Sequence, residues 1–63
     1  MTQKEMSYLE DAIGHEDNII KICAEFTTYL EDEDLAVFMN EEMKNHSKVK
    51  TKLMKLMEEK ANE

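Results

Sequence analysis

The chain has 63 residues, a formal charge of −7 and eight basic side chains, all of them lysine. A charge of this sign argues against nucleic-acid backbones and anionic membrane surfaces as partners, because both attract clustered basic residues. No apolar run approaches the ~18 residues of a membrane span, and the N-terminus lacks the basic-then-apolar pattern of a signal peptide. We therefore expect an intracellular protein that binds neither membranes nor nucleic acid.

The short length limits the core that the chain can build. A domain of this size buries only about 60% of the surface that its unfolded form exposes. Disulfides, a metal or oligomerisation usually supply the missing stability, and the single cysteine, Cys23, excludes an intrachain disulfide. We therefore expect either a second copy of the chain or a bound metal to complete the fold.

The first part of the chain predicts one long helix, over residues 3–31. Proline is absent, Gly14 is the one glycine, and good helix formers are frequent. Thr2, followed three residues later by Glu5, has the pattern of a capping box. Apolar residues then recur every three or four positions, at Met6, Leu9, Ala12, Ile13, Ile19, Ile20, Cys23, Phe26 and Leu30.

Four consecutive acids, at residues 31–34, predict a turn between two helices. Negative charge is unfavourable at the end of a helix and favourable at the start of the next, where Asp32 or Asp34 can cap it. Helical spacing resumes over residues 34–60, at Leu35, Phe38, Met39, Met43, Val49, Leu53, Leu56 and Met57. A turn this short makes the two helices antiparallel neighbours.

The expected fold is all-α, with residues 1–63 forming one two-helix antiparallel hairpin. Two helices that meet along one seam leave half of each apolar stripe exposed, so we expect the hairpin to dimerise into a four-helix bundle. Ten of the fifteen acids lie in the first 34 residues, and six of the eight lysines lie within residues 44–60. The hairpin therefore brings Glu5, Glu10 and Asp11 beside Lys52, Lys55 and Lys60.

Two polar residues interrupt the apolar stripes, one in each predicted helix. At about 100° per residue, Glu16 lies near the middle of the first stripe and His46 near the centre of the second, with Glu42 and Lys50 about 40° to either side. Folding about the acidic turn brings Glu16 level with Val49, one helical turn from His46. The carboxylates and the imidazole are therefore expected to meet.

This polar group has two main interpretations. Glu16 from one helix, with Glu42 and His46 from the next, would be half of a ferritin-like di-metal site that a second hairpin completes. The ferritin-like spacing is Glu-x-x-His, whereas Glu42 and His46 are four residues apart, a spacing that still places both on one face. Alternatively, Glu16 pairs with Lys50 or His46 and sets the register of a structural core. A rotated helix would instead leave Glu16 at an exposed edge.

Several other residues have less distinctive interpretations. His15 lies off the apolar stripe and is expected at the surface, whereas Cys23 lies on the stripe and is expected to be a buried, unreactive thiol. Gly14 is either tolerated within the helix or allows a neighbouring helix to approach closely. The acidic turn is expected to be a solvated loop, since it lacks the glycine and spacing of a calcium loop.

The run from Lys4 to Glu16, KEMSYLEDAIGHE, followed by Asp32, Leu35 and His46, resembles the small clostridial spore-coat-like proteins related to the coat F group. The resemblance covers most of the chain and implies a ferritin-like, self-associating helical protein of a sporulating cell or spore coat. It carries over no catalytic residue. Val49 and Lys50 stand where several relatives have a further histidine, which weakens an inherited metal role.

The sequence thus favours a non-enzymatic structural or protein-interaction role in which the partner is another copy of the chain, with no catalytic residue and no cofactor. The alternative is a minimal ferritin-like protein in which Glu16, Glu42 and His46 of two hairpins bind iron or manganese. A third interpretation, from the charge alone, is an acidic protein that occupies a basic surface on another protein.

Overall fold

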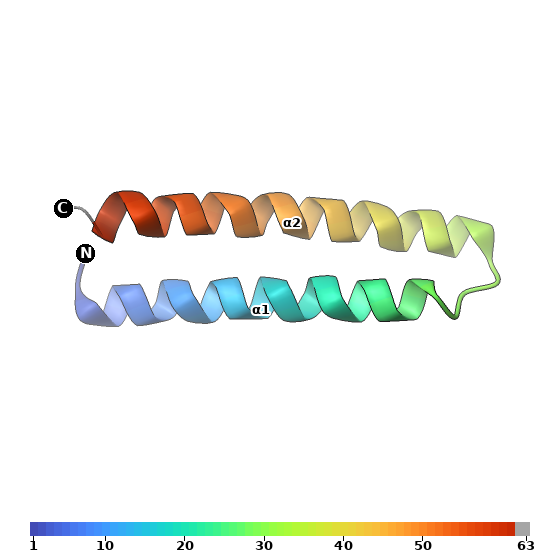
Figure 1. Cartoon of the computed structure of the whole chain (residues 1–63), viewed down its shortest axis with the longest axis horizontal. Helices are drawn as coiled ribbons and strands as arrows, with labels where there is room; N and C mark the ends of the chain where they lie inside the picture. Colours follow the sequence, from blue (N-terminus) through green and yellow to red (C-terminus); the bar gives the residue numbers. More distant parts are fainter. Residues whose placement is uncertain (62–63) are drawn as a thin grey trace.

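The computed structural model describes residues 1–61, which form an antiparallel hairpin of two long helices (Figure 1). Helix α1 spans Gln3–Thr27 and helix α2 spans Glu33–Ala61, and within residues 1–61 there is no strand. The hairpin measures 48 × 15 × 11 Å. The N-terminus and the last turn of α2 lie together at one end, here called the open end; residues 28–32 form the turn end. The all-α hairpin predicted from the sequence is confirmed.

Helix α1 begins with the predicted capping box. The Glu5 backbone N–H donates to the Thr2 hydroxyl at 3.0 Å, and the Thr2 backbone N–H donates to the Glu5 carboxylate at 2.8 Å. The pKa of the Glu5 carboxyl is lowered, first by its hydrogen bond from the Thr2 backbone and then by the Thr2 side chain, with a smaller contribution from the Lys60 charge. That contribution agrees with the predicted approach of Lys60 to the acidic start of α1.

Acid should weaken this cap. Because the pKa of Glu5 is lower in the folded chain than its ordinary value of 4.5, the cap contributes fully above that ordinary value. Its contribution is lost as the pH falls through the lowered folded pKa. We expect an NMR titration of Glu5 to have its midpoint below the ordinary value, and Thr2→Ala to move that midpoint upward. A midpoint that Thr2→Ala leaves unchanged would contradict this assignment.

Helix α1 ends at Thr27, earlier than the predicted end at residue 31. The Thr28 backbone N–H donates to the Glu25 carbonyl at 3.2 Å and the Tyr29 N–H to the Phe26 carbonyl at 3.0 Å, so the last turn tightens. The Thr28 hydroxyl also donates to the Glu25 carbonyl, at 2.7 Å. These bonds satisfy carbonyls at the helix end before the unfavourable acids of the turn are reached.

Asp32 provides the cap of α2, one of the two candidates in the sequence. Its carboxylate accepts the Leu35 backbone N–H at 3.0 Å, and its carbonyl accepts the Ala36 N–H at 3.0 Å. Glu33 and Asp34 follow in the first turn, where the helix dipole favours negative charge. The acidic run therefore both ends one helix and starts the next.

The seam between the helices is built from one row of side chains on each, here called the inner rows. Successive members are three or four residues apart and are buried or half-buried: Leu9, Ile13, Glu16, Ile20, Cys23 and Thr27 on α1, and Ala36, Met39, Met43, His46, Lys50, Leu53 and Met57 on α2. Cys23, 6% exposed, is the one fully buried residue in the described part of the chain. The expectation of a buried thiol is confirmed.

Gly14 lies in the middle of α1 on an exposed face. A methyl group at its Cα would have no neighbour within 4 Å and its φ is not positive, so neither packing nor backbone conformation within the hairpin requires glycine. We expect Gly14→Ala to stabilise the protein by about 1 kcal/mol, because alanine restricts the unfolded chain and favours the helix. Urea unfolding measures this. A destabilised variant would show that another molecule approaches Gly14.

Candidate functional site

A polar cluster lies near the middle of the seam. His46 Nδ1 of α2 is 2.5 Å from a carboxylate oxygen of Glu16 on α1, and the two side chains are 29% and 17% exposed. His46 Nε2 is 3.6 Å from a carboxylate oxygen of Glu42, one turn earlier on α2 and 39% exposed. The imidazole therefore lies between two carboxylates.

The chemistry of the cluster follows from the two contacts of the ring. An ionised carboxylate only accepts hydrogen bonds, so the short contact requires a proton on His46 Nδ1 that is donated to Glu16. The distance from Nε2 to Glu42 is too long for a hydrogen bond and is a contact between charges when the imidazole carries both protons. The cluster is thus an interhelical hydrogen bond between an imidazole and a carboxylate, with a second carboxylate beside it.

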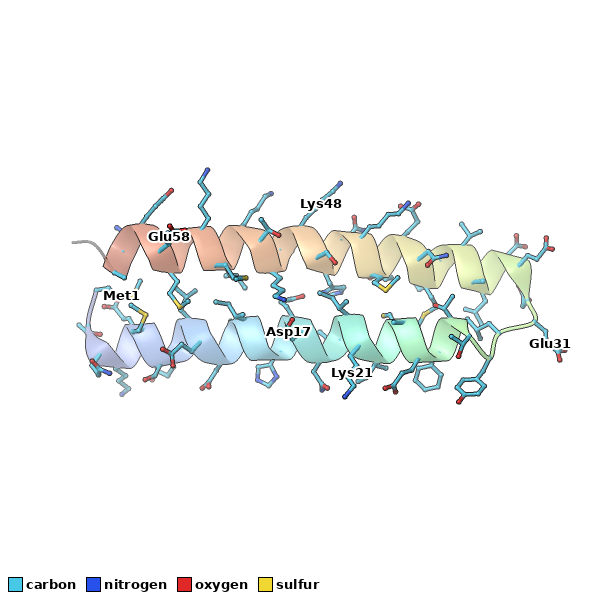
Figure 2. The ribbon with its side chains drawn as sticks, viewed as in Figure 1. Met1, Asp17, Lys21, Glu31, Lys48 and Glu58 are labelled. Carbon is cyan, nitrogen blue, oxygen red and sulfur yellow. The ribbon has the colours of Figure 1, made fainter. Side chains whose placement is uncertain are left out.

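The structure brings together the three residues that the sequence singled out. Glu16 meets His46 directly, whereas the sequence placed it one turn away, level with Val49. Of its two candidate partners, His46 is therefore the one that it contacts. Lys50 Nζ lies 2.5 Å from a carboxylate oxygen of Asp17 instead. The Asp17 side chain projects into the space between the helices (Figure 2). Its contact with Lys50 was not predicted, although Asp17 directly follows Glu16 in the sequence.

A metal site within one hairpin is not formed by this arrangement. Among residues 1–61, no group of three or more His, Cys, Asp or Glu side chains is placed to hold a metal ion. Both nitrogens of His46 face carboxylates, and they point in different directions from the ring, so the donors of the cluster do not converge on one point. The sequence hypothesis divided the site between two hairpins, and its complete ligand set therefore requires a second copy. His15, the other histidine, is exposed.

A second row of side chains runs along each helix outside the seam. Each member of these outer rows directly precedes an inner-row residue: Tyr8, Ala12, His15, Ile19, Ile22 and Phe26 on α1, and Leu35, Phe38, Glu42, Asn45, Val49, Lys52 and Leu56 on α2. The spacing is again three and four residues. Eleven large apolar side chains are exposed in the described part of the chain, and seven of them belong to the outer rows. The exposed apolar surface is therefore concentrated on these rows.

Both outer rows face the same side of the hairpin. One residue back along an α-helix is a rotation of about 100°, and both rows are rotated back from the shared seam by this step. Because the helices are antiparallel and have the same hand, equal rotations turn both rows to the same side of their common plane. We call this side the open face.

The opposite face is mostly polar. The residues that directly follow inner-row positions are Glu10, Gly14, Asp17, Lys21, Ala24 and Thr28 on α1, and Val37, Asn40, Lys44, Ser47, Thr51, Met54 and Glu58 on α2. The hairpin is therefore a two-helix layer with one apolar side and one polar side. A shallow groove at the open end of the polar side is lined partly by Met6, Met54 and Met57.

Neither helix is long and apolar enough to cross a membrane, as far as the described residues go. Comparisons with protein-family models, curated proteins and solved structures give no significant match. The geometry of the two faces and of the polar cluster therefore carries the functional argument.

Proposed function

We propose that this chain is a non-enzymatic structural or protein-interaction module that acts as a homodimer, in which two hairpins join their open faces to form a four-helix bundle. The observation that carries the proposal is the concentration on that one face of seven of the eleven large apolar side chains that are exposed within residues 1–61. Exposed apolar side chains gathered along one full side of a small protein mark an interaction surface.

The surface area and shape of the single hairpin support this proposal. The chain exposes 5078 Å², whereas a compact monomer of 7.4 kDa exposes about 4,200 Å². Its radius of gyration is 14.6 Å, against about 11 Å for a compact domain of this length. A second two-helix layer of equal length would cover the open face from end to end, and a second copy supplies that layer.

Thermal unfolding at several protein concentrations tests the proposal. If folding is linked to pairing, the melting temperature rises with chain concentration, because mass action favours the folded dimer. We expect the melting temperature to rise when the chain concentration is increased over a hundredfold range. A melting temperature independent of concentration, with the mass of one chain, would refute the homodimer.

The resemblance to spore-coat-like proteins suggests a sporulating cell or spore coat as the setting.

A di-metal protein is the second candidate, favoured by the meeting of Glu16, Glu42 and His46. Glu42 belongs to an outer row and lies on the open face, so a second hairpin would bring another set of the same three residues to the bundle interior. Two Glu16, two Glu42 and two His46 side chains resemble the ligand set of ferritin-like sites. One nitrogen of each His46 would have to turn from its carboxylate to the metal.

Native mass spectrometry after addition of Fe²⁺ or Mn²⁺ tests this candidate. Two ions per dimer, lost in the Glu16→Leu variant, would establish a metal site. A dimer that gains no ions in the presence of either metal would contradict the di-metal candidate and support the purely structural role. Lys50→Gln is a suitable control, because Lys50 lies in the seam but cannot ligate a metal as an ammonium group.

A further inference from the structure

Each outer row can pair with the same row of a second copy that is turned end over end. On α1, residues equally spaced about position 17 pair Tyr8 with Phe26, Ala12 with Ile22, and His15 with Ile19. On α2, residues equally spaced about position 47 pair Phe38 with Leu56, Glu42 with Lys52, and Asn45 with Val49. Apolar side chains therefore meet apolar side chains at three of the six levels, and the one acid–lysine match joins opposite charges. At the two levels nearest the centre, His15 meets Ile19 and Asn45 meets Val49.

One two-fold axis can serve both rows. Contacts across the seam join residues 16 and 46 and residues 17 and 50, so positions 17 and 47 lie at nearly the same height along the hairpin. A two-fold axis at that height, between two stacked hairpins and perpendicular to the helices, places α1 on the second copy's α1 and α2 on its α2. Each contact between two residues then occurs twice, as in any isologous interface.

We infer that the two hairpins pair head to tail, with the turn end of one copy over the open end of the other. This inference rests on the proposed homodimer and specifies the orientation of its subunits. In this orientation the Glu42 carboxylate of one copy lies opposite the Lys52 ammonium of the other, and the reverse contact is made on the other side of the axis.

The opposite orientation, turn end on turn end, makes poorer contacts. It stacks α1 of one copy on α2 of the other, and at the same seam heights it places Glu42 against Ile22 and Lys52 against Ala12. Each charge then faces an apolar side chain and loses water without gaining a partner, which is costly. The head-to-tail orientation avoids both contacts.

The distribution of net charge favours the same orientation. Residues 25–42, which surround the turn, contain seven acids and no lysine, whereas the rest of the chain contains eight of each. The whole net charge of −7 therefore lies at the turn end. Turn-on-turn stacking would bring the acidic turn ends of the two copies within a few Debye lengths of each other. Head-to-tail pairing separates them by most of the 48 Å length of the hairpin.

Charge reversal at Lys52 tests the orientation. In the head-to-tail dimer, we expect Lys52→Glu to raise the dissociation constant at least about tenfold, because it puts like charges together at two symmetric contacts. Adding Glu42→Lys should then restore most of the loss. Lys48→Glu is the matched control, since Lys48 projects outward from α2 away from α1 and should change the constant by less than about threefold (Figure 2). Independent effects of the Lys52 and Glu42 changes would contradict the pairing.

A distance measurement decides the orientation without relying on that charge pair. A spin label at Glu31→Cys, in a Cys23→Ala background that retains helicity, reports the separation of the two turn ends (Figure 2). Head-to-tail pairing about the axis at position 17 predicts a separation of about 40 Å, twice the rise of about 20 Å from that position to residue 31. Turn-on-turn pairing predicts less than about 20 Å, roughly two interhelical spacings. A short distance would overturn the orientation but keep the homodimer. Absence of any distance, with the mass of one chain, would refute the homodimer itself.

Discussion

Replacing Phe38 by glutamate is expected to separate the dimer into single hairpins. Phe38 is 57% exposed in the hairpin and lies on the open face, where the second copy would bury it. A carboxylate at this position would be buried at two symmetric sites. We expect Phe38→Glu to raise the dissociation constant at least about 100-fold, equivalent to about 2.7 kcal/mol, as measured by sedimentation equilibrium.

The neighbouring residue Val37 provides a matched control for this experiment. Val37 is 60% exposed, nearly the same fraction as Phe38, but it belongs to the opposite face. Val37→Glu introduces the same charge into the same turn of α2, so it should change the dissociation constant by less than about threefold. Equal effects of the two variants would show that the open face does not form the interface.

Removing His46 alone is expected to destabilise the protein, whereas removing both His46 and Glu16 is not. His46→Leu leaves the Glu16 carboxylate, 17% exposed, without its hydrogen-bond donor, which should cost about 1–3 kcal/mol. Replacing both residues by leucine removes the charge as well as its partner, and such double replacements are often neutral or stabilising by about 1–4 kcal/mol. Urea unfolding at one fixed chain concentration measures both effects.

The more exposed ion pair on the polar face is the control for this prediction. Asp17, 56% exposed, contacts Lys50 across the same seam, and solvent screens the pair. Asp17→Asn should therefore cost less than about 1 kcal/mol. If His46→Leu cost no more than Asp17→Asn, the central cluster would not contribute to stability beyond an ordinary surface ion pair.

Periodicity and charge at the turn were sufficient to predict the hairpin. The three- and four-residue spacing of apolar side chains gave both helices, and the capping box at Thr2 and Glu5 located the start of the first. The end of α1 was missed by four residues. The hydroxyl and backbone bonds of Thr28 decide where the last turn tightens, and these depend on local geometry that spacing alone does not contain.

The candidate site was predicted in its membership but not in its contacts. Glu16 and His46 stood out because polar residues on an apolar stripe need a partner, and Glu42 lay one turn from His46. Whether Glu16 would meet His46 or Lys50 depended on a shift of about one helical turn between the helices, which the sequence does not fix. The outer rows were hidden in the sequence because their members alternate with inner-row residues and become distinct only when the seam is known.

Sedimentation equilibrium of the unmodified chain tests the central claim most directly. The account predicts a mass of twice the 7.4 kDa chain at micromolar and higher concentrations, with dissociation on dilution. A mass of one chain at every concentration, with the helices still folded, would contradict it, because the hairpin would then be stable with its open face exposed.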